Sequence, residues 1–495
     1  MSTRTAAALR IWRSRSLRTA GDRAYAGYLA LLVALVVVFP LVRAAGVALT
    51  SPGAVTILTA SVTPAHAAVV TAMLWAGALT LGRVRGPALR PPFPTRALAT
   101  SDISRVEAFG GVFVRSGAVL TGAVAGAAGL MGAGLGLSGA AAPGAVTLFV
   151  LAGACVGATA SVAWLVGQAV PRLAGALALA LLTLGPLILI APGLLPLTPW
   201  GWAGILLSST PAPAALAPLG ALVALLVAAV PGLLARLTLE RLSVQAMRWE
   251  RAAGEASIME LASATAVYRA TPSVGRRLRA VRPAAARWRV FLARDTVGAA
   301  RTPVRLAAGI LTLTAAGGLL ALAAAPGLGA PLGAIAGLLL FAGLGPVTDG
   351  VRHAANIAGD LPLYGLSDGS LLAHHSLFPL VLTLAIVGGV ATAGFVSAGF
   401  GIGAASGTIV GGLLALLVRI AHALKGPLPP ALLAPIPTPF GDLGGAVRLL
   451  WAVDGIVLCA GAGVAASILV TAPVAAIAMG AVMVAIVAHR WRNRR

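Results

Sequence analysis

Long apolar runs constrain this chain more than any other feature, because an α-helix needs about 20 apolar residues to cross the hydrocarbon core of a bilayer. Twelve such runs occur, and only 10% of all residues are charged, against about 25% in soluble domains. We expect spans at residues 25–42, 64–82, 116–138, 144–167, 174–195, 213–235, 304–325, 329–347, 377–399, 406–424, 451–470 and 472–488.

The placement of the basic residues predicts how these spans are oriented. Loops retained in the cytoplasm carry an excess of Arg and Lys. Here every second loop is basic, while the others carry one clear charge, Arg43. The alternation holds from the basic N-terminus to the tail HRWRNRR. The sequence therefore predicts an all-α, polytopic membrane protein with about twelve transmembrane helices and both termini in the cytoplasm.

The formal charge of +23 raises the question of a nucleic-acid partner. Basic side chains that bind nucleic acid gather into one stripe or patch, whereas these are spread over many loops. We therefore expect membrane lipid, and no nucleic acid, around this chain.

The Ala- and Gly-rich composition, with Lys425 as the single lysine, is typical of a GC-rich bacterial genome and suggests the bacterial cytoplasmic (plasma) membrane.

The single lysine also bears on nucleotide binding. A P-loop needs a lysine directly after a glycine-rich run, and Lys425 lies in RIAHALKGPLPP, which has no such run. If ATP drives this protein, another chain hydrolyses it, and no cofactor is expected to bind here directly. Cys155 and Cys459 lie inside apolar runs and indicate small packing residues rather than a disulfide framework.

The runs divide into two halves of six, separated by a polar segment. That segment carries apolar residues at helical spacing among charges, which is typical of amphipathic helices at a membrane surface or of a solvated linker. The first apolar run lacks a cleavage site directly behind it, so a retained span is favoured over a signal peptide. We expect a basic connecting segment at 1–24, a first six-helix half at 25–235, a linker at 236–303, a second six-helix half at 304–488 and a basic tail at 489–495.

The two halves also look alike in sequence. A basic, Trp-containing segment leads into each, LRIWRSRSLRTAGDR and ARWRVFLARDTVGAARTP, and a long loop follows the second span of each. Within these loops LATSDISRVEAFGGVF can be laid on YGLSDGSLLAHHSLFP. Ser104 with Glu107 has the spacing of a capping box, and Asp368 or Ser370 is a candidate N-cap. We expect a short cytoplasmic helix before the third span of each half.

These paired segments resemble the membrane subunits of ABC-2-type exporters. In that family an amphipathic connecting helix precedes the first span, and a coupling helix between the second and third spans docks on the ATPase. The resemblance implies a non-enzymatic permease that forms the translocation path and couples to a separate ATP-binding cassette ATPase dimer. It implies connecting-helix positions at Trp12, Arg13, Trp288, Arg294 and Asp295, and ATPase contacts at Asp102, Ser104, Glu107, Asp368, Ser370 and His374.

A secondary transporter of the major facilitator type is the alternative, because it also has six plus six spans and a long central loop. Its Gly-x-x-x-Asp-Arg-type loop motif is absent here. Ion-coupled transport usually needs a buried ionisable group. The only carboxylate inside an expected span is Asp454. Asp454 is either a functional intramembrane polar site or a polar residue satisfied by neighbouring helices.

A membrane-embedded enzyme is the third class. The six histidines occur mostly singly, and the patterns G-x-S-x-G and H-E-x-x-H are absent. His374 and His375, in DLPLYGLSDGSLLAHHS, are adjacent, and adjacent residues on a helix point about 100° apart. They cannot both hold one metal ion without help from elsewhere. A helix that faces solvent or the ATPase is favoured over a metal site.

Overall fold

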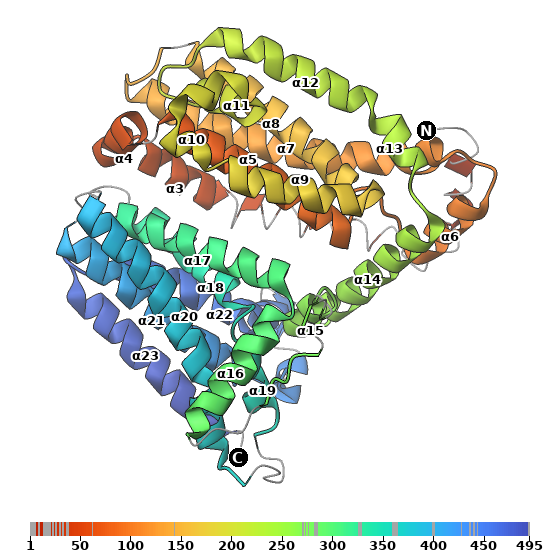
Figure 1. Cartoon of the computed structure of the whole chain (residues 1–495). Helices are drawn as coiled ribbons and strands as arrows, with labels where there is room; N and C mark the ends of the chain where they lie inside the picture. Colours follow the sequence, from red (N-terminus) through yellow and green to blue (C-terminus); the bar gives the residue numbers. More distant parts are fainter. Residues whose placement is uncertain are drawn as a thin grey trace. The chain divides into compact units, whose positions relative to one another are not determined.

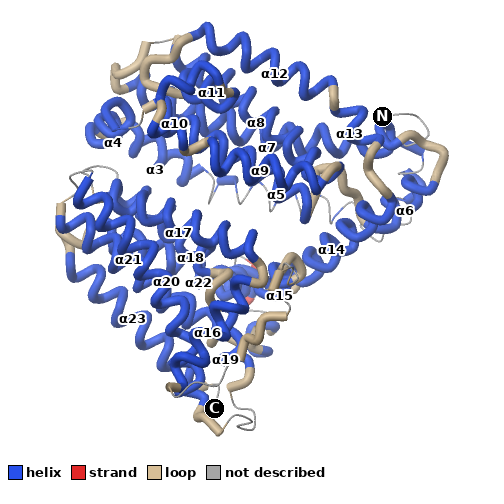
Figure 2. The backbone as a smooth tube through the Cα atoms, in the orientation of Figure 1, coloured by secondary structure: helices blue, strands red, loops and turns tan. Residues whose placement is uncertain are grey.

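The computed structural model of this 495-residue chain is built almost entirely of helices (Figure 1), and Figure 2 shows how short most of the connecting loops are. It describes residues 39–493 and scattered positions before them, with gaps at 62, 143, 270–271, 273, 276, 282–285, 325–328, 359–364, 398–400, 427, 435–436, 439–440 and 443. Within these residues the only strands are β1 (Pro437–Thr438) and β2 (Gly441–Asp442), a minimal antiparallel pair. The expected helical fold class is confirmed.

Ten helices of the described residues are long and apolar enough to cross a membrane, or up to twelve if each of two bent helix pairs is one span. Each of the ten overlaps an expected span. They run over Pro64–Val84, Arg105–Leu137, Ala145–Ala169, Pro171–Ile190, Pro213–Ala235, Pro303–Ala323, Asp368–Val396, Ile402–Ala423, Ala446–Ser467 and Pro473–Arg492. Their outer faces carry exposed large apolar side chains such as Val119 and Ile477. Soluble proteins rarely expose extended apolar patches, so these helices belong to a multi-pass membrane protein.

Two expected spans take another form. Residues 25–42 fall mostly outside the described part of the chain, and the bent pair Val42–Leu49 and Pro52–Thr59 follows them, with an angle of 69°. The run 329–347 breaks into α18 (Gly329–Leu344) and α19 (Asp349–Asn356), which meet at 71°. Pro346 explains the break, because proline lacks the N–H that a continuing helix needs. At 1.5 Å per residue, α18 alone is roughly 24 Å long, shorter than a bilayer core.

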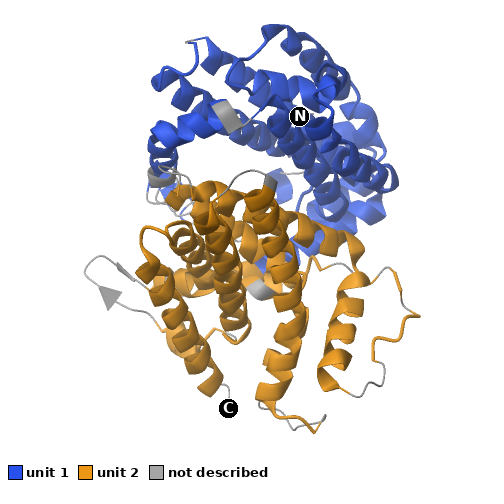
Figure 3. Ribbon diagram, turned by 60° about the vertical axis from the view of Figure 1, so that its left-hand side comes forward, with its two compact units in different colours: residues 1–254 blue, residues 255–495 orange. Residues whose placement is uncertain are grey.

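The first of two compact units is Met1–Gly254, drawn in blue in Figure 3. In it α5 packs on α8 and α9, α7 packs on α8, and the short helix α11 lies against α5. The elements are α3 (Phe39–Leu49), α4 (Pro52–Thr56), η2 (Ile57–Ser61), α5 (Pro64–Val84), α6 (Pro92–Thr100), α7 (Arg105–Leu137), α8 (Ala145–Ala169), α9 (Pro171–Leu184), α10 (Leu187–Ile190), η3 (Pro192–Leu197), α11 (Pro199–Leu206), η4 (Pro213–Ala215), α12 (Leu216–Ala228), α13 (Val230–Ala235) and α14 (Leu239–Ser257), whose last residues pass the boundary.

The second unit is Glu255–Arg495. In it α18 packs on α17, α21 and α22, and α21 also packs on α20 and α23. Its core is aliphatic and includes Leu313, Leu340 and Val418. Besides α18 and α19, the elements are α15 (Leu261–Ala266), α16 (Arg287–Ala300), α17 (Pro303–Ala323), α20 (Asp368–Ser397), α21 (Ile402–Ala423), η5 (Pro430–Leu433), α22 (Gly444–Ser467) and α23 (Pro473–Arg492).

Glycines let two helix pairs approach until their backbones touch. A β-carbon added at Gly337 of α18, or at Gly463 of α22, would lie 2.0 or 1.9 Å from a carbonyl oxygen of the facing helix. In the first unit the same holds for Gly82 of α5 and Gly167 of α8, at 2.1 and 2.2 Å. Small residues at a helix interface allow this close packing inside a membrane. These contacts require glycine and no larger residue.

The polar segment expected at 236–303 contains three helices, α14, α15 and α16. α14 is amphipathic: Leu242, Gln245, Ala246 and Ala252 are buried, while its other face is charged. α14 packs within the first unit, and α16 packs on α17 and α20 within the second. The segment is therefore not one solvated linker, because each of these two helices is fixed to the spans of a unit.

Candidate functional site

In the first unit the loop between α5 and α7 carries Asp102, Ser104 and Glu107, three of the expected ATPase contacts, and all three are exposed. Ser104 is the N-cap of α7, since its Oγ accepts a hydrogen bond from the Glu107 backbone N–H at 3.2 Å. α7 then continues for 33 residues. The expected helix start is correct, but it opens the long α7 itself. The short helix of this loop is α6, which begins at Pro92.

Two buried glutamines fix this loop to the spans. Gln168 at the end of α8 donates from Nε2 to Oε1 of Gln245 on α14, at 3.0 Å. Gln168 Oε1 accepts from the Ala88 N–H at 3.1 Å, and Gln245 Oε1 accepts from the Gly86 N–H at 3.3 Å. Gln245 Nε2 also donates to the carbonyl oxygen of Gly82 at 3.0 Å. Because an unpaired buried polar group costs about 1–3 kcal/mol, these amides hold residues 86–88 in place.

The sequence-based interpretation missed both side chains, although a signal was present. Gln168 and Gln245 are the only glutamines in the chain. A buried amide must find hydrogen-bond partners, and Gln168 ends a 25-residue apolar helix. Arg241 of α14 adds to the junction by donating from Nη1 to the Gln168 carbonyl oxygen at 2.9 Å. α14 thus supplies hydrogen-bond partners both to the end of α8 and to the adjoining loop.

In the second unit His375 joins α20 to α16. Its side chain is 0% exposed, with Nδ1 2.7 Å from Asp295 Oδ2 and Nε2 2.7 Å from Arg294 Nη1. A guanidinium group can only donate, so Nε2 accepts and Nδ1 carries the proton that it donates to the carboxylate. Gly350 of α19 lies against this network, and a β-carbon there would be 2.6 Å from Nδ1.

His375 therefore differs from its expected place on a helix face open to solvent or to a partner. It is enclosed by its own chain because α16, at the expected connecting-helix position, packs against the start of α20. The structure brings Arg294 and Asp295 together with the loop before the third span, two features that the sequence treated as separate.

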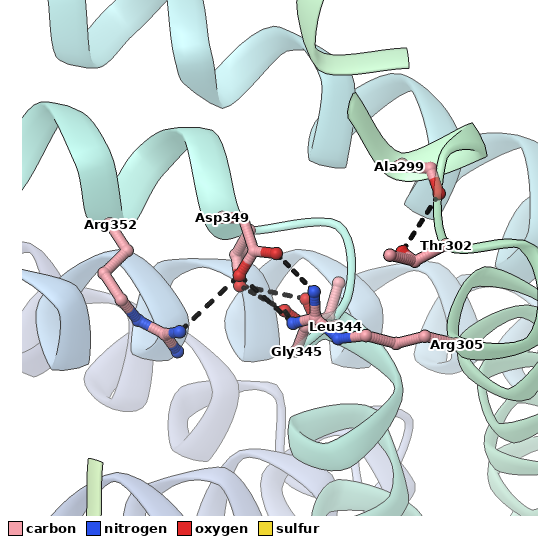
Figure 4. Close-up of polar contacts among 8 residues, drawn as sticks. Ala299, Thr302, Arg305, Leu344, Gly345, Asp349 and Arg352 are labelled. Carbon is pink, nitrogen blue, oxygen red and sulfur yellow. Dashed lines mark hydrogen bonds and ion pairs between the residues drawn. The ribbon is translucent and has the colours of Figure 1, made fainter. Parts of the chain in front are cut away.

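Asp349 makes a second junction, between α17 and α19 (Figure 4). Its Oδ1 lies 3.1 Å from Arg305 Nη2 and 3.5 Å from Arg352 Nη1, and its Oδ2 accepts from Arg305 Nη1. Arg305 also donates to the carbonyl oxygen of Gly345, at 3.2 Å. Figure 4 shows both guanidinium groups directed at the carboxylate. These side chains are partly exposed, so their main effect is to set the direction of α19 after the break at Pro346.

The remaining expected ATPase contacts lie in the first two turns of α20. The N-cap is Ser367 and neither of the expected residues, since its Oγ accepts from the Ser370 N–H at 3.3 Å. Asp368 and Ser370 follow it, half-buried, and a carboxylate in the first turn suits the helix dipole. His374 is half-buried, with Nδ1 2.6 Å from the Ser370 carbonyl oxygen and its ring 5.1 Å from that of Phe291 on α16.

Of the expected connecting-helix residues, Trp288 opens α16 and is 46% exposed, with the Arg289 guanidinium carbon 5.2 Å from its ring centre. Trp12 lies half-buried in a short helical stretch, and Arg13 is outside the described residues. Only the second of the two Trp-bearing segments can therefore be traced as a helix that packs on spans.

Asp454 is held by cations from two other segments. Its oxygens lie 2.8 Å from Lys425 Nζ and 2.5 Å from Arg490 Nη2, and His422 Nδ1 is 3.9 Å away. Burial lowers the pKa of Lys425, just past the end of α21, while its hydrogen bond to Asp454 opposes that shift. Lys425 Nζ also lies 3.8 Å from the centre of the Trp451 ring. Both carboxylate oxygens thus have structural partners.

No group of three or more His, Cys, Asp or Glu side chains that could hold a metal ion occurs within the described part of the chain. No protein-family model, no curated protein and no solved structure matches the chain. The candidate site is therefore defined by its geometry. In the first unit the polar helix α14 is hydrogen-bonded to residues 86–88, in the loop after α5. In the second unit the polar helix α16 is bonded to His375, near the start of α20.

Proposed function

We propose that this chain is the membrane subunit of an ABC-2-like exporter in a bacterial cytoplasmic membrane, where it forms the translocation path and couples to a separate ATP-binding cassette dimer. The observation that carries the proposal is that, in each unit, a polar helix outside the spans makes hydrogen bonds near the docking segment, residues 86–107 in the first unit and 365–375 in the second. Gln245 of α14 holds residues 86–88, and Arg294 and Asp295 of α16 hold His375. A force applied to either segment by an ATPase would reach the spans directly.

Similar packing within each unit supports the internal repeat on which the proposal depends. In the first unit α5, which precedes the docking segment, packs on α8 and α9; in the second, α18 packs on α21 and α22. α7 and α20 follow the docking segments and pack on the next helix, α8 and α21 respectively. These pairs correspond in the two units, although α5 also packs on α11 and α18 also packs on α17.

The geometry around Asp454 gives no support to the major facilitator alternative. Proton or ion coupling through this carboxylate would require its oxygens to be available. They are instead occupied by Lys425 and Arg490. We therefore propose no second function.

Isolation of the chain from its native membrane in mild detergent tests the proposal. We expect an ATP-binding cassette subunit to co-purify, and ATP hydrolysis by that subunit to change when this chain is present. Absence of any associated ATPase, together with transport in vesicles that depends on a proton gradient, would contradict the proposal and favour a secondary transporter.

Charge reversal at the docking segments is the residue-level test. Asp102→Lys and Asp368→Lys are each expected to weaken ATPase binding at least about tenfold, because a charge placed opposite its like costs more than about 1.4 kcal/mol at an interface. Membrane insertion should be unchanged. Glu250→Lys, at an exposed acid on α14, is the matched control. Wild-type ATPase stimulation in both aspartate variants would remove the docking assignment.

A further inference from the structure

The second unit encloses a cavity of about 500 Å³ with a strongly basic lining. Its charged and polar wall comes chiefly from Arg269, Arg305, Arg352, Arg419, His422 and Tyr268. No acidic side chain is among the described residues that line it, and the rest of the wall is largely apolar, with Phe341 and Ile456 as its largest members. A basic wall beside an apolar one suits a ligand that is itself divided into an anionic and an apolar part.

Arg419 is the most deeply buried arginine in this wall. Its side chain belongs to α21 and is only 8% exposed. One of its terminal nitrogens donates to the carbonyl oxygen of Phe341, and its guanidinium carbon lies 3.7 Å from the centre of the Phe341 ring. Its Nε is buried and has no hydrogen-bond partner among the described residues. Because a buried charge is costly unless it is paired, an anion beside Arg419 would supply what the chain does not.

Two more buried polar atoms at the same cavity also have no hydrogen-bond partner among the described residues, Tyr268 Oη and His422 Nδ1. The nearest Asp454 oxygen is 3.9 Å from His422 Nδ1, beyond hydrogen-bonding distance. Native structures leave few buried polar groups unpaired. Here the unpaired atoms of Arg419, Tyr268 and His422 all belong to residues that line one cavity.

Nearby acids do not cancel the positive charge of the wall. Asp349 pairs with both Arg305 and Arg352, so one carboxylate faces two guanidinium groups. Arg419 and Arg269 add two further charges. Guanidinium groups bind phosphate and carboxylate oxygens through paired hydrogen bonds, and the volume lies within the range of small-ligand pockets.

We propose that this cavity binds an oxyanion carried on an apolar body, the phosphate or carboxylate head of an acidic amphiphile, with an acidic phospholipid as the favoured source. The wall is built from the ends of spans: the start of α17, the end of α18 and the end of α21. The predicted topology puts those ends at the cytoplasmic face, where basic pockets between helices bind anionic headgroups. α15 supplies Leu261 and Thr265 to the same wall, so the ligand joins this polar helix to the spans.

Lipid binding to the purified full-length chain in detergent tests this proposal, which does not rest on the exporter function. Native mass spectrometry and thermal unfolding would compare phosphatidylglycerol, phosphatidylcholine with the same acyl chains, and inorganic phosphate. We expect phosphatidylglycerol to bind at least tenfold more tightly than phosphatidylcholine and to raise Tm. Equal binding of the two lipids would overturn the proposal. If inorganic phosphate alone raises Tm and the two lipids bind equally, the cavity binds an oxyanion, and the proposal that its ligand carries an apolar body is overturned.

Single substitutions test whether phosphatidylglycerol binds in this cavity. Tyr268→Phe removes a hydroxyl that has no hydrogen-bond partner among the described residues, so the fold should be unaffected. We expect about tenfold weaker phosphatidylglycerol binding because a hydrogen bond to a charged group is lost. Arg269→Gln, at an exposed arginine, should weaken it similarly. Tyr28→Phe and Arg172→Gln, at exposed positions of the first unit, are the matched controls and should bind as the unaltered chain does. Unchanged affinity in both cavity variants would show that the lipid binds elsewhere.

Discussion

Several polar side chains in this protein form hydrogen bonds with residues that lie far away in the sequence. Adjacent histidines on one helix were expected to point in different directions, and they do: His375 is buried, while His374 is half-buried against Phe291. The sequence did not reveal that His375 would meet Arg294, 81 residues earlier. The helical geometry is local and can be predicted, whereas the identity of the buried partner depends on how α16 packs.

His375→Leu tests whether this network stabilises the second unit. The substitution leaves the partly buried Asp295 carboxylate and the Arg294 guanidinium group without their shared partner, at a cost of about 1–3 kcal/mol. The unfolding midpoint in detergent should fall accordingly. His374→Leu, at the next residue, loses only contacts within its own helix turn and the Phe291 ring, so its effect should be clearly smaller. Equal losses would contradict the central role of His375.

For the glutamine pair, too, the sequence predicts that a partner is needed but not which residue it is. Composition alone singles out Gln168 and Gln245, and polarity near an apolar run indicates that Gln168 needs a partner. Their mutual hydrogen bond, across 77 residues, follows only from the docking of α14. The buried residues that join these segments were therefore harder to recognise than the aspartates expected to contact a partner.

At the scale of helices, apolarity predicted where the chain crosses a bilayer but not how long each helix is. α7 begins at Arg105, about ten residues before the expected span, because Arg105, Glu107 and Arg115 end the apolar window without ending the helix. With 33 residues it is about 50 Å long, well beyond the roughly 30 Å of a bilayer core. The break after α18 had a visible cause in Pro346, whereas the ion pair at this 71° turn, between Asp349 of α19 and Arg305 of α17, joins residues 44 positions apart and could not be predicted.

Gly463→Ala tests the backbone contact between α18 and α22. A methyl group there would lie 1.9 Å from a carbonyl oxygen, so the helices must separate, and we expect a loss of about 2 kcal/mol or more. Gly388→Ala on α20 is the control, because nothing lies within 4 Å of its added β-carbon. Alanine is the better helix former, so this variant should be neutral or more stable by up to about 1 kcal/mol. Reversible thermal unfolding in detergent would compare the two.

For the whole molecule, charge alternation predicts a sidedness that labelling can test. Replacing Cys155 and Cys459 by alanine leaves a chain without cysteine. A single cysteine at Gly193, in η3, is then expected to react with a membrane-impermeant maleimide in intact cells. A cysteine at Arg248, on the exposed face of α14, should react only after permeabilisation. Labelling of position 248 in intact cells would reverse the predicted orientation of that helix.

The chain forms two compact units, whereas the division of the spans into two repeated halves of six stays a prediction. Apolar runs suggested a linker over 236–303, and the compact units meet at Gly254 and Glu255, inside that segment. Sequence could not assign α14 to one unit and α16 to the other, because both are polar helices in the segment between the two sets of spans. The two polar helices also differ in their order along the chain. α14 follows the spans of the first unit, whereas α16 precedes the spans of the second.

The glycine contacts restrict how either unit can move. Sliding α18 along α22 by even one residue, 1.5 Å of rise, would bring a side chain against a carbonyl oxygen that now faces a bare α-carbon at Gly337 or Gly463. α5 and α8 are interlocked in the same way at Gly82 and Gly167. The two helices of each pair are therefore expected to move together as one rigid body. Movement between helices within a unit is therefore expected along helix faces separated by side chains, whose rotamers can change, and not within these two pairs.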